Sequence, residues 1–370
     1  QWSLPRTQSP QGWDITTGSP SAVIAVIGTG VRWDHEDLAG NIWANTGESN
    51  DGLDNDGNGY IDDTRGWDFQ QNDNNPMDQN GHETAVAGVA AAVTNNSTGI
   101  TGVCWSCRIM PLRVDFTSEQ VASAINYAVN KGAKIIVMSF GNYDPATYGA
   151  DTVVETAINN GVAQGVLMIS SAGNDNVNTP NYPSALSNVI GVAATDQDDL
   201  RATFSNWGTW VDVAAPGAGL RTTSLSSYNN VTGTSVASGF VAGVAGLLYS
   251  KYPSLSIADA TSMILAGVDS ISPDQPIGSG RINVYKTVHD GIAPAVSITN
   301  PSDGATISGS VNITANAADN IGVTKVEFYL DGNLASTDTS SPYSYTLATS
   351  ALANGSHTIT AKAYDDALNI

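Results

Sequence analysis

The sequence predicts two domains of different class: an α/β domain with a doubly wound parallel sheet in residues 1–289, and a small β-sandwich in residues 295–370. In the first part, short β-branched and apolar runs alternate with helical patterns, which indicates a parallel sheet covered by helices on both faces. The pattern changes at residues 290–294, which we interpret as a linker. Beyond the linker only strand patterns of period two follow.

The elements of the first domain can be placed from apolar runs and helix-capping patterns. Strands are predicted at residues 22–27, 134–139 and 166–170. Helices are predicted at residues 117–132, 151–160 and 256–267. Thr117 with Gln120, and Ser256 with Asp259, have the residue types and the spacing that begin a helix. Parallel sheets of this kind carry their functional sites at the carboxyl ends of the strands.

The second domain is predicted from strand patterns separated by turn residues. Strands are expected at residues 296–298, 311–314, 325–330 and 357–364. Asp331 and Gly332 form a typical two-residue hairpin turn. The chain stops after Ile370, where the last strand of such a sandwich is expected, so we expect a truncated sandwich.

Composition and charge exclude several function classes. Asp and Glu number 35 against 14 Lys and Arg, which gives a net charge of -21. This balance argues against nucleic acid and against an anionic membrane surface, because both attract clustered basic residues. The longest apolar stretch, residues 239–249, is too short to span a membrane. We expect a secreted, extracellular monomer, processed or trimmed at its start because Gln1 follows neither a Met nor a signal-like segment.

The two cysteines, Cys104 and Cys107, have the spacing C-x-x-C. A small structural disulfide in a secreted loop is the favoured interpretation. Free thiols, or a redox or metal site, are the alternatives; for zinc the chain has neither a second cysteine pair nor a nearby histidine.

Three polar residues in separate motifs have the chemistry of nucleophilic catalysis. Ser235 lies two residues after Gly233 at the predicted start of a buried helix, where its own N–H can stabilise an oxyanion. His82 begins a helix of small residues, and Asn174 follows a buried strand. Each has a simpler explanation, as a helix-capping serine, a structural histidine and a turn asparagine. The three together favour catalysis.

Residues 1–289 resemble the subtilisin-like serine proteases, or subtilases, and most closely their thermitase-like branch. The motifs that carry the resemblance stand in the order of the family at residues 25–31 (AVIGTGV), 35–38 (HEDL), 80–88 (NGHETAVAG), 92–100 (AVTNNSTGI), 138–141 (MSFG), 170–174 (SSAGN), 204–208 (FSNWG), 213–217 (VAAPG), 233–243 (GTSVASGFVAG) and 280–283 (GRIN). The resemblance implies a secreted serine endopeptidase with a subtilisin-like fold. Its second domain resembles the Ig-like accessory modules of bacterial hydrolases.

The resemblance also implies roles for residues. Ser235 is the expected nucleophile, His82 the general base and then acid, and Asn174 the oxyanion donor. The segments expected to flank the S1 pocket and to pair with an extended substrate are Ser139, Phe140 and Gly141, and Ser171, Ala172 and Gly173. A broad endopeptidase that prefers apolar or aromatic P1 residues is expected.

Two departures from the family pattern bear on activity. Gly28 stands where the family has its catalytic Asp, and Glu83 stands where it has a glycine beside the histidine. Asp34 and Asp37 are near in sequence but do not match the motif. The sequence therefore predicts a dyad with reduced activity, since losing this carboxylate slows turnover roughly 10⁴-fold in serine proteases. The alternative is a pseudoprotease, catalytically dead and retained as a binding scaffold.

Two calcium sites are predicted. An EF-hand-like loop would offer oxygens from Asp54, Asp56, Asn58, Tyr60, Asp62 and Asp63. Arg65 replaces the bidentate Glu of a true EF-hand, and a solvated acidic loop is the alternative. The resemblance implies a second site, with ligands from Asp37 and Asn96 and from the backbone carbonyls of Val93, Thr98 and Ile100.

The expected partners follow from these assignments. The first domain is expected to act on protein or peptide substrates, with Ca²⁺ as its cofactor and with no nucleic acid or membrane. The second domain is expected to bind a polysaccharide or a protein surface.

Overall fold

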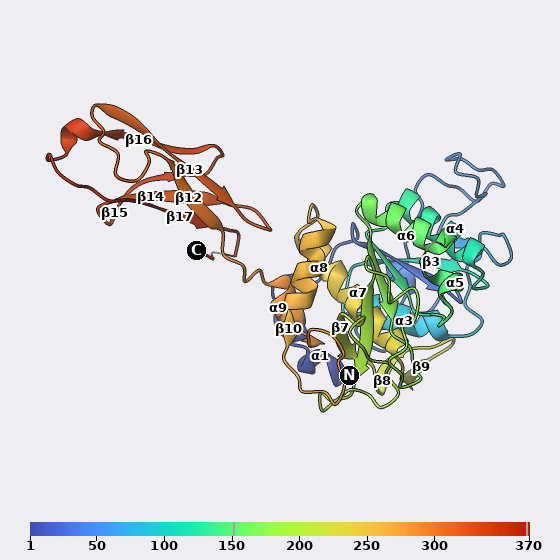
Figure 1. The fold of residues 1–370 in the computed structure, drawn as a ribbon. Coiled ribbons are helices and arrows are strands. Elements are labelled where there is room, and N and C mark those ends of the chain that lie inside the picture. Colours follow the sequence, from blue (N-terminus) through green and yellow to red (C-terminus); the bar gives the residue numbers. More distant parts are fainter. Residues whose placement is uncertain (151, 368) are drawn as a thin grey trace. The chain divides into compact units, whose positions relative to one another are not determined.

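The computed structural model describes residues 1–150, 152–367 and 369–370, which divide into two compact units (Figure 1). The first domain is Gln1–Val288 and the second is His289–Ile370. Among the described residues, no helix is both long enough and apolar enough to cross a membrane.

A single mixed sheet forms the centre of the first domain. Within the described residues its strands run in the order β10 (Val268–Asp269), β11 (Arg281–Ile282), β7 (Val213–Pro216), β6 (Ile190–Thr195), β5 (Leu167–Ser171), β4 (Ile135–Met138), β1 (Val23–Gly28), β3 (Arg108–Arg113) and β2 (Trp67–Asp68). All neighbours pair in parallel except β10 with β11. A separate antiparallel pair is formed by β8 (Leu220–Thr223) and β9 (Tyr228–Val231).

Helices cover both faces of this sheet, which confirms the predicted doubly wound class (Figure 1). On one face, Ala25 and Ile27 of β1 share a core with Ile125 of α4 (Ser118–Asn130) and Ile158 of α6 (Val153–Ala163). On the other face, α3 (His82–Ala91) packs against α7 (Thr234–Lys251). The remaining helices are α1 (Ser3–Arg6), α2 (Ser9–Trp13), η1 (Ala39–Asn41), α5 (Pro145–Tyr148), α8 (Ile257–Ala266) and α9 (Val284–Val288).

The predicted capping residues begin their helices as expected. Thr117 accepts a hydrogen bond from the backbone N–H of Gln120 at the start of α4. Ser256 accepts one from the N–H of Asp259 at 3.1 Å, at the start of α8. The helix expected at residues 151–160 is α6, and its predicted first residue, 151, lies outside the described residues.

The two cysteines lie in the loop between α3 and β3 and form a disulfide with each other, which confirms the favoured interpretation of the C-x-x-C pair. Both are fully buried. Glycines make the room: a Cβ at Gly18 would lie 2.3 Å from Cys104 Sγ, and one at Gly246 would lie 2.5 Å from Cys107 Sγ. The bond therefore belongs to the packed interior beside α7.

The second domain is the predicted small β-sandwich. Its described residues form two antiparallel sheets, in the orders β12 (Ala295–Asn300), β13 (Ser310–Ala318), β16 (Tyr343–Ala348) and β15 (Asn333–Asp338), β14 (Lys325–Leu330), β17 (Ile359–Tyr364), with η2 at Thr349–Ala351. Ile313, Val326 and Phe328 are fully buried in the core between them. Asp331 and Gly332 both have positive φ, as the predicted hairpin turn requires.

Candidate active site

Three elements bring the predicted catalytic residues together. His82 begins α3, Ser235 lies in the first turn of α7, and Asn174 follows β5. His82 Nε2 lies 2.9 Å from Ser235 Oγ. Asn174 Oδ1 accepts hydrogen bonds from Thr234 N at 2.8 Å and from Thr234 Oγ1 at 2.9 Å, directly beside the serine. One hydroxyl, one imidazole and one amide therefore meet at the start of α7.

The second ring nitrogen of His82 contacts a carboxylate that the sequence pattern did not predict for it. His82 Nδ1 lies 2.8 Å from Glu83 Oε1. Glu83 Oε2 accepts hydrogen bonds from Thr29 N at 2.9 Å and from Thr29 Oγ1 at 2.7 Å. The Glu83 side chain is fully buried, and both of its oxygens have partners. The predicted dyad is therefore incomplete: Ser235, His82 and Glu83 form one hydrogen-bonded chain.

Gly28 leaves the space that the Glu83 side chain occupies. It ends β1, and a Cβ at this position would lie 2.3 Å from Glu83 Oε1 and 2.4 Å from Glu83 Cδ. Nonbonded atoms do not approach so closely, so a side chain at residue 28 and the observed Glu83 exclude one another. The two departures from the family pattern are thus one structural change.

The two aspartates that follow Gly28 most closely in the sequence, Asp34 and Asp37, do not contact His82. Asp34 pairs with Arg32 at 2.6 Å. Asp37 is buried and accepts hydrogen bonds from Asn96 Nδ2 and Ile100 N. Neither takes the place of the family's Asp, in agreement with their mismatch to the motif.

A buried aspartate that the sequence analysis did not single out fixes the start of α3. Asp78 Oδ1 accepts the N–H groups of Asn80 and Gly81, and Asp78 Oδ2 accepts from Thr84 N and Thr84 Oγ1. Gly81 has a φ of 98° at the N-cap, a conformation that favours glycine. These contacts set the direction in which His82 leaves the turn.

The charges around His82 set its basicity. Burial lowers the pKa of the imidazole, but the hydrogen bond and charge of Glu83 and the charge of Asp78 outweigh burial. The pKa of His82 therefore lies above its ordinary value. The side chain keeps 40% of its surface exposed, so a substrate can reach it.

The expected oxyanion donors border one small space. The carbonyl oxygen of Asn174 is held by Thr234, which leaves its amide nitrogen for other partners. A Cβ built on Gly233 would lie 3.7 Å from both Asn174 Nδ2 and Ser235 N. Both nitrogens therefore border the same point beside Gly233.

Comparison with known proteins decides the family. Residues 19–280 match the model described as the Subtilase family, and residues 294–361 match that of a bacterial Ig domain. The chain belongs to the subtilase family. It is a subtilisin-like serine protease with a C-terminal Ig-like domain.

Relatives and a solved structure agree with this assignment. The subtilase is 40% identical to thermitase of Thermoactinomyces vulgaris over 78% of this chain and 95% of that protein. It is 30% identical to subtilisin Savinase of Lederbergia lenta over 76% of this chain and 96% of that protein. A protease structure from Pseudoalteromonas arctica PAMC 21717 is 27% identical, with a TM-score of 0.64, over 76% of this chain and 93% of that one.

The two segments expected to bind substrate follow β4 and end β5. Ser139 is buried, and its carbonyl oxygen lies 3.1 Å from Ser235 Oγ. Phe140 packs edge-on against Phe116 and Tyr148. Gly141 is exposed, Ser171 and Ala172 are buried, and Gly173 donates its N–H to Thr234 Oγ1 at 3.0 Å.

Two asparagines that the sequence analysis missed position these substrate segments. Asn181 Nδ2 donates to Ser171 O at 3.4 Å, and Asn206 Nδ2 donates to Ala172 O at 2.9 Å. A Cβ at Gly141 would lie 2.4 Å from Asn181 Nδ2, and one at Gly173 would lie 2.4 Å from Asn206 Nδ2. The glycines of both segments therefore allow these side-chain amides to approach.

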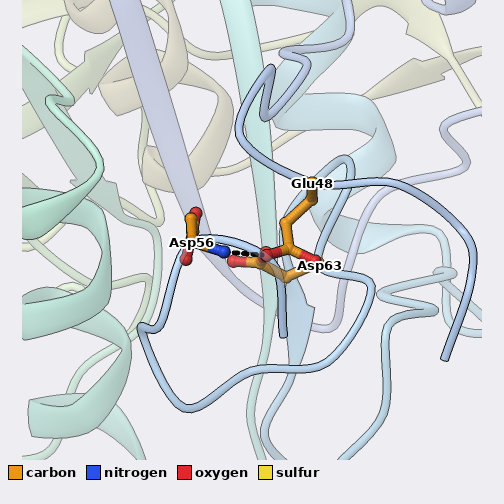
Figure 2. A group of neighbouring side chains, drawn as sticks. All are labelled: Glu48, Asp56 and Asp63. Atoms are coloured by element: carbon orange, nitrogen blue, oxygen red, sulfur yellow. Dashed lines mark hydrogen bonds between the residues drawn. The ribbon is translucent and has the colours of Figure 1, made fainter. Parts of the chain in front are cut away.

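The acidic loop of the subtilase gathers three carboxylates, one of which the sequence analysis missed (Figure 2). Glu48, Asp56 and Asp63 each place one oxygen within 4.8 Å of the others. The backbone N–H of Asp56 donates to Glu48 Oε1 at 2.9 Å, while Glu48 Oε2 is buried and none of the described residues bonds it. The ammonium group of Lys131 contacts Asp56 and lies 3.6 Å from Asp63.

The other predicted ligands of this loop point to different partners. Asp54 accepts the N–H groups of Asn58 and Gly59, and Asp62 accepts those of Asp51 and Gly52. Asn58 Nδ2 donates to Asp63, and the ring of Tyr60 packs against Trp67, Phe69 and Tyr127. The cluster therefore differs from the EF-hand-like set: it gains Glu48, and it does not include Asp54 or Asp62.

The second predicted calcium set is partly assembled. Asp37 Oδ1 accepts from Asn96 Nδ2 at 2.6 Å, and Asp37 Oδ2 accepts from Ile100 N at 2.8 Å. The N–H of Val93 donates to Asp37 O at 2.7 Å, and that of Thr98 donates to Asn96 Oδ1 at 3.1 Å. The five residues are neighbours, with the carboxylate of Asp37 bound to protein donors.

Proposed function

We propose that this subtilase cleaves peptide bonds through an acyl-enzyme formed on Ser235. The observation that carries the proposal is the position of His82, 2.9 Å from Ser235 Oγ on one side and 2.8 Å from Glu83 Oε1 on the other. This is the spacing that a nucleophile, a general base and an orienting carboxylate need.

The proposed reaction proceeds in two half-reactions. His82 Nε2 takes the proton of Ser235 Oγ while the oxygen attacks the substrate carbonyl. The N–H of Ser235 and the amide of Asn174 stabilise the resulting oxyanion, because both border the same space. His82 then gives the proton to the leaving amine, and a water activated by His82 releases the acyl group.

Glu83 takes the role that Asp has in the family. Its carboxylate fixes the Nδ1–H tautomer of His82 and stabilises the imidazolium that forms during the reaction. Thr29 donates two hydrogen bonds to the other oxygen, so the carboxylate cannot turn away from the imidazole. The absence of a side chain at Gly28 leaves the space that this carboxylate fills.

Substrate binding is proposed along the two strand-end segments, 139–141 and 171–173, with an extended peptide pairing to their backbone. The aromatic packing of Phe140 supports a preference for apolar or aromatic P1 residues. A cavity of about 330 Å³ is lined in part by Thr29, which bonds Glu83, and by Phe116, which packs against Phe140; it offers room for a further substrate side chain.

We also propose that calcium supports the first domain. Carboxylate oxygens are the ligands that Ca²⁺ prefers, and Glu48 keeps one buried oxygen that no described residue bonds. Glu48, Asp56 and Asp63 would hold the ion, with Lys131 moving away from Asp56. Asp37 and Asn96 form the second proposed site, after rotation of their side chains.

Secretion, and binding of a polysaccharide or protein surface by the Ig-like domain, complete the proposal. The acidic charge of -21 supports an extracellular role. The alternative, a dead protease kept as a binding scaffold, loses its main support because His82 has a carboxylate partner.

A serine-directed organophosphate separates the two functions. In an active protease, one label attaches to Ser235, because reaction needs a hydroxyl activated by His82. We expect the intact mass to rise by one adduct in the parent, with no adduct in Ser235→Ala and far slower labelling in His82→Ala. If the parent chain resists the label at the rate of His82→Ala, the protease function is refuted and the scaffold function is favoured.

A further inference from the structure

Three aspartates far apart in the sequence meet at one end of the Ig-like domain. Asp290 precedes β12, Asp319 follows β13 and Asp365 follows β17. Each places one carboxylate oxygen within 4.8 Å of the others. Asp290 is only 1% exposed and Asp365 is fully buried, although both side chains are charged.

The hydrogen bonds of the cluster leave buried oxygens without donors. Asp290 Oδ1 accepts from Ile292 N at 3.2 Å and Asn320 Nδ2 at 3.3 Å, while Asp290 Oδ2 is buried and has no partner among the described residues. Asp319 Oδ2 accepts from the N–H groups of Ile321 and Gly322, while Asp319 Oδ1 has no partner in the part of the chain that the structure describes. Asn320 Oδ1 is a third such oxygen.

The charge of the cluster makes these free oxygens costly. Asp290 and Asp365 are buried, and the carboxylates of all three aspartates lie within 4.8 Å of one another. A buried carboxylate that keeps an unpartnered oxygen beside like charges is unfavourable unless a cation compensates it. The arrangement therefore lacks one positively charged group.

We propose that Asp290, Asp319, Asp365 and the side-chain oxygen of Asn320 bind a Ca²⁺ ion in the Ig-like domain. Hard oxygen ligands select Ca²⁺ or Mg²⁺ over softer metals. Mg²⁺ demands near-ideal octahedral geometry and keeps several of its waters, whereas Ca²⁺ takes six to eight oxygen ligands in a flexible geometry. Several buried protein oxygens that converge on one point therefore favour calcium.

The site would join the entry of the domain to both of its sheets. Asp319 directly follows β13 in one sheet, and Asp365 directly follows β17 in the other. Asn369 already ties this region together, because its Nδ2 donates to Asp290 O and to Asp365 Oδ2, both within 2.8 Å. A bound ion adds a second tie at the same place, and we expect it to stabilise the Ig-like domain against unfolding.

The test uses the full chain with Ser235→Ala to prevent self-digestion, followed by calorimetry in EDTA and in calcium. All eight tryptophans lie at or before residue 210, so a heat-absorption peak without a tryptophan fluorescence change belongs to the Ig-like domain. We expect calcium about a hundredfold above its Kd to raise that transition by roughly 10 °C. Magnesium at the same concentration is expected to raise it less.

Conservative variants decide whether the three aspartates are the site. In Asp319→Asn the amide oxygen can keep the turn hydrogen bonds, and in Asp290→Asn it can keep those of Ile292, so both variants are expected to fold. Both should lose the calcium-dependent shift and bind one fewer Ca²⁺ per chain in equilibrium dialysis. In EDTA both should melt at or above the parent temperature, because one of three like charges is gone.

Asp303→Asn is the matched control, since Asp303 is an exposed aspartate of the same domain and its loss changes the charge equally. It should keep the full shift. The proposal is overturned if the parent shows no calcium shift in the Ig-like transition, or if Asp290→Asn and Asp319→Asn keep that shift.

Discussion

The active site and the Ig-like domain bury carboxylates in opposite ways. In the first domain both oxygens of Glu83 are occupied, one by His82 and the other by Thr29. In the second domain Asp290 and Asp319 each keep one buried oxygen without a donor from residues 289–367 and 369–370. Both arrangements are acidic and buried, but only the first is complete within the protein.

The comparison distinguishes a carboxylate that stabilises a neighbouring protein group from a carboxylate that needs a bound cation. Where protein donors satisfy every oxygen, the charge can stabilise a neighbouring imidazolium. Where like charges meet and oxygens stay free, an added ion lowers the free energy of the folded state. Substitutions around Glu83 are expected to have the larger effects, because they lower the rate of catalysis.

The largest effect is expected from Glu83→Gln. The amide keeps the size of the side chain but cannot stabilise the imidazolium, so kcat should fall roughly 10⁴-fold with little change in KM. Steady-state kinetics on a peptide substrate measure this. Glu36→Gln, an exposed glutamate outside the catalytic residues, is the control. A Glu83→Gln variant within tenfold of the parent would show that Glu83 has no catalytic role.

The next effect concerns the space beside Glu83. Gly28→Ala puts a Cβ 2.3 Å from Glu83 Oε1, so the carboxylate must move. A displacement of about 1 Å from a productive geometry lowers kcat on the order of 100-fold. The same substitution at Gly291, where a Cβ meets nothing within 4 Å, should leave kcat unchanged. Equal rates for the two variants would contradict the crowding at Gly28.

A smaller effect is expected when one donor to Glu83 is removed. Thr29→Val keeps the shape of the side chain but loses the hydroxyl that lies 2.7 Å from Glu83 Oε2. A hydrogen bond to a charged group of this kind is worth roughly tenfold in kcat. Thr29→Ser keeps the hydroxyl and should stay near the parent rate. If Val and Ser behave alike, the Thr29 hydroxyl does not hold Glu83.

The smallest effect is a shift in pH dependence. His82 must be neutral to accept a proton, and Glu83 raises its pKa, so the parent should lose kcat/KM as the pH falls through a value above about 6.5, the ordinary pKa of histidine. In Glu83→Gln, burial lowers the pKa with less opposition from charge, so the acid limb should move to lower pH. An unmoved limb would mean that Glu83 does not set the basicity of His82.

The sequence predicted most of the fold but only part of the active site. The run AVIAVI and the capping residues Thr117 and Ser256 gave their elements correctly, because these signals are local. The strand Arg108–Arg113 was not predicted, and it carries Pro111, a residue that argues against a strand inside a sheet. Its neighbours β1 and β2 hold it in place despite that proline.

The role of Glu83 could not be read from its position. Adjacent side chains on a helix normally point in different directions, so a His followed by Glu does not predict contact. Only the first turn of α3, with Asp78 fixing its start and Gly28 leaving space, lets the two meet. A paired change, a glycine where the family has Asp and a carboxylate beside the His, is the signal that could have revealed it.

The acidic clusters could not be predicted from the sequence, for a different reason. Glu48 lies outside the loop motif, and Asp290, Asp319 and Asp365 are separated by dozens of residues. Their convergence depends on tertiary packing at one end of a sandwich, which spacing along the chain does not encode.

The most direct test exchanges the two carboxylate positions. Gly28→Asp alone should crowd Glu83, and Glu83→Gly alone should leave His82 without a carboxylate, so each should lower kcat on the order of 100-fold or more. The double variant Gly28→Asp/Glu83→Gly rebuilds the family pattern and should recover to within roughly tenfold of the parent. A double variant no faster than the slower single variant, or a Glu83→Gly variant at the parent rate, would contradict the assignment of Glu83 as the third catalytic group.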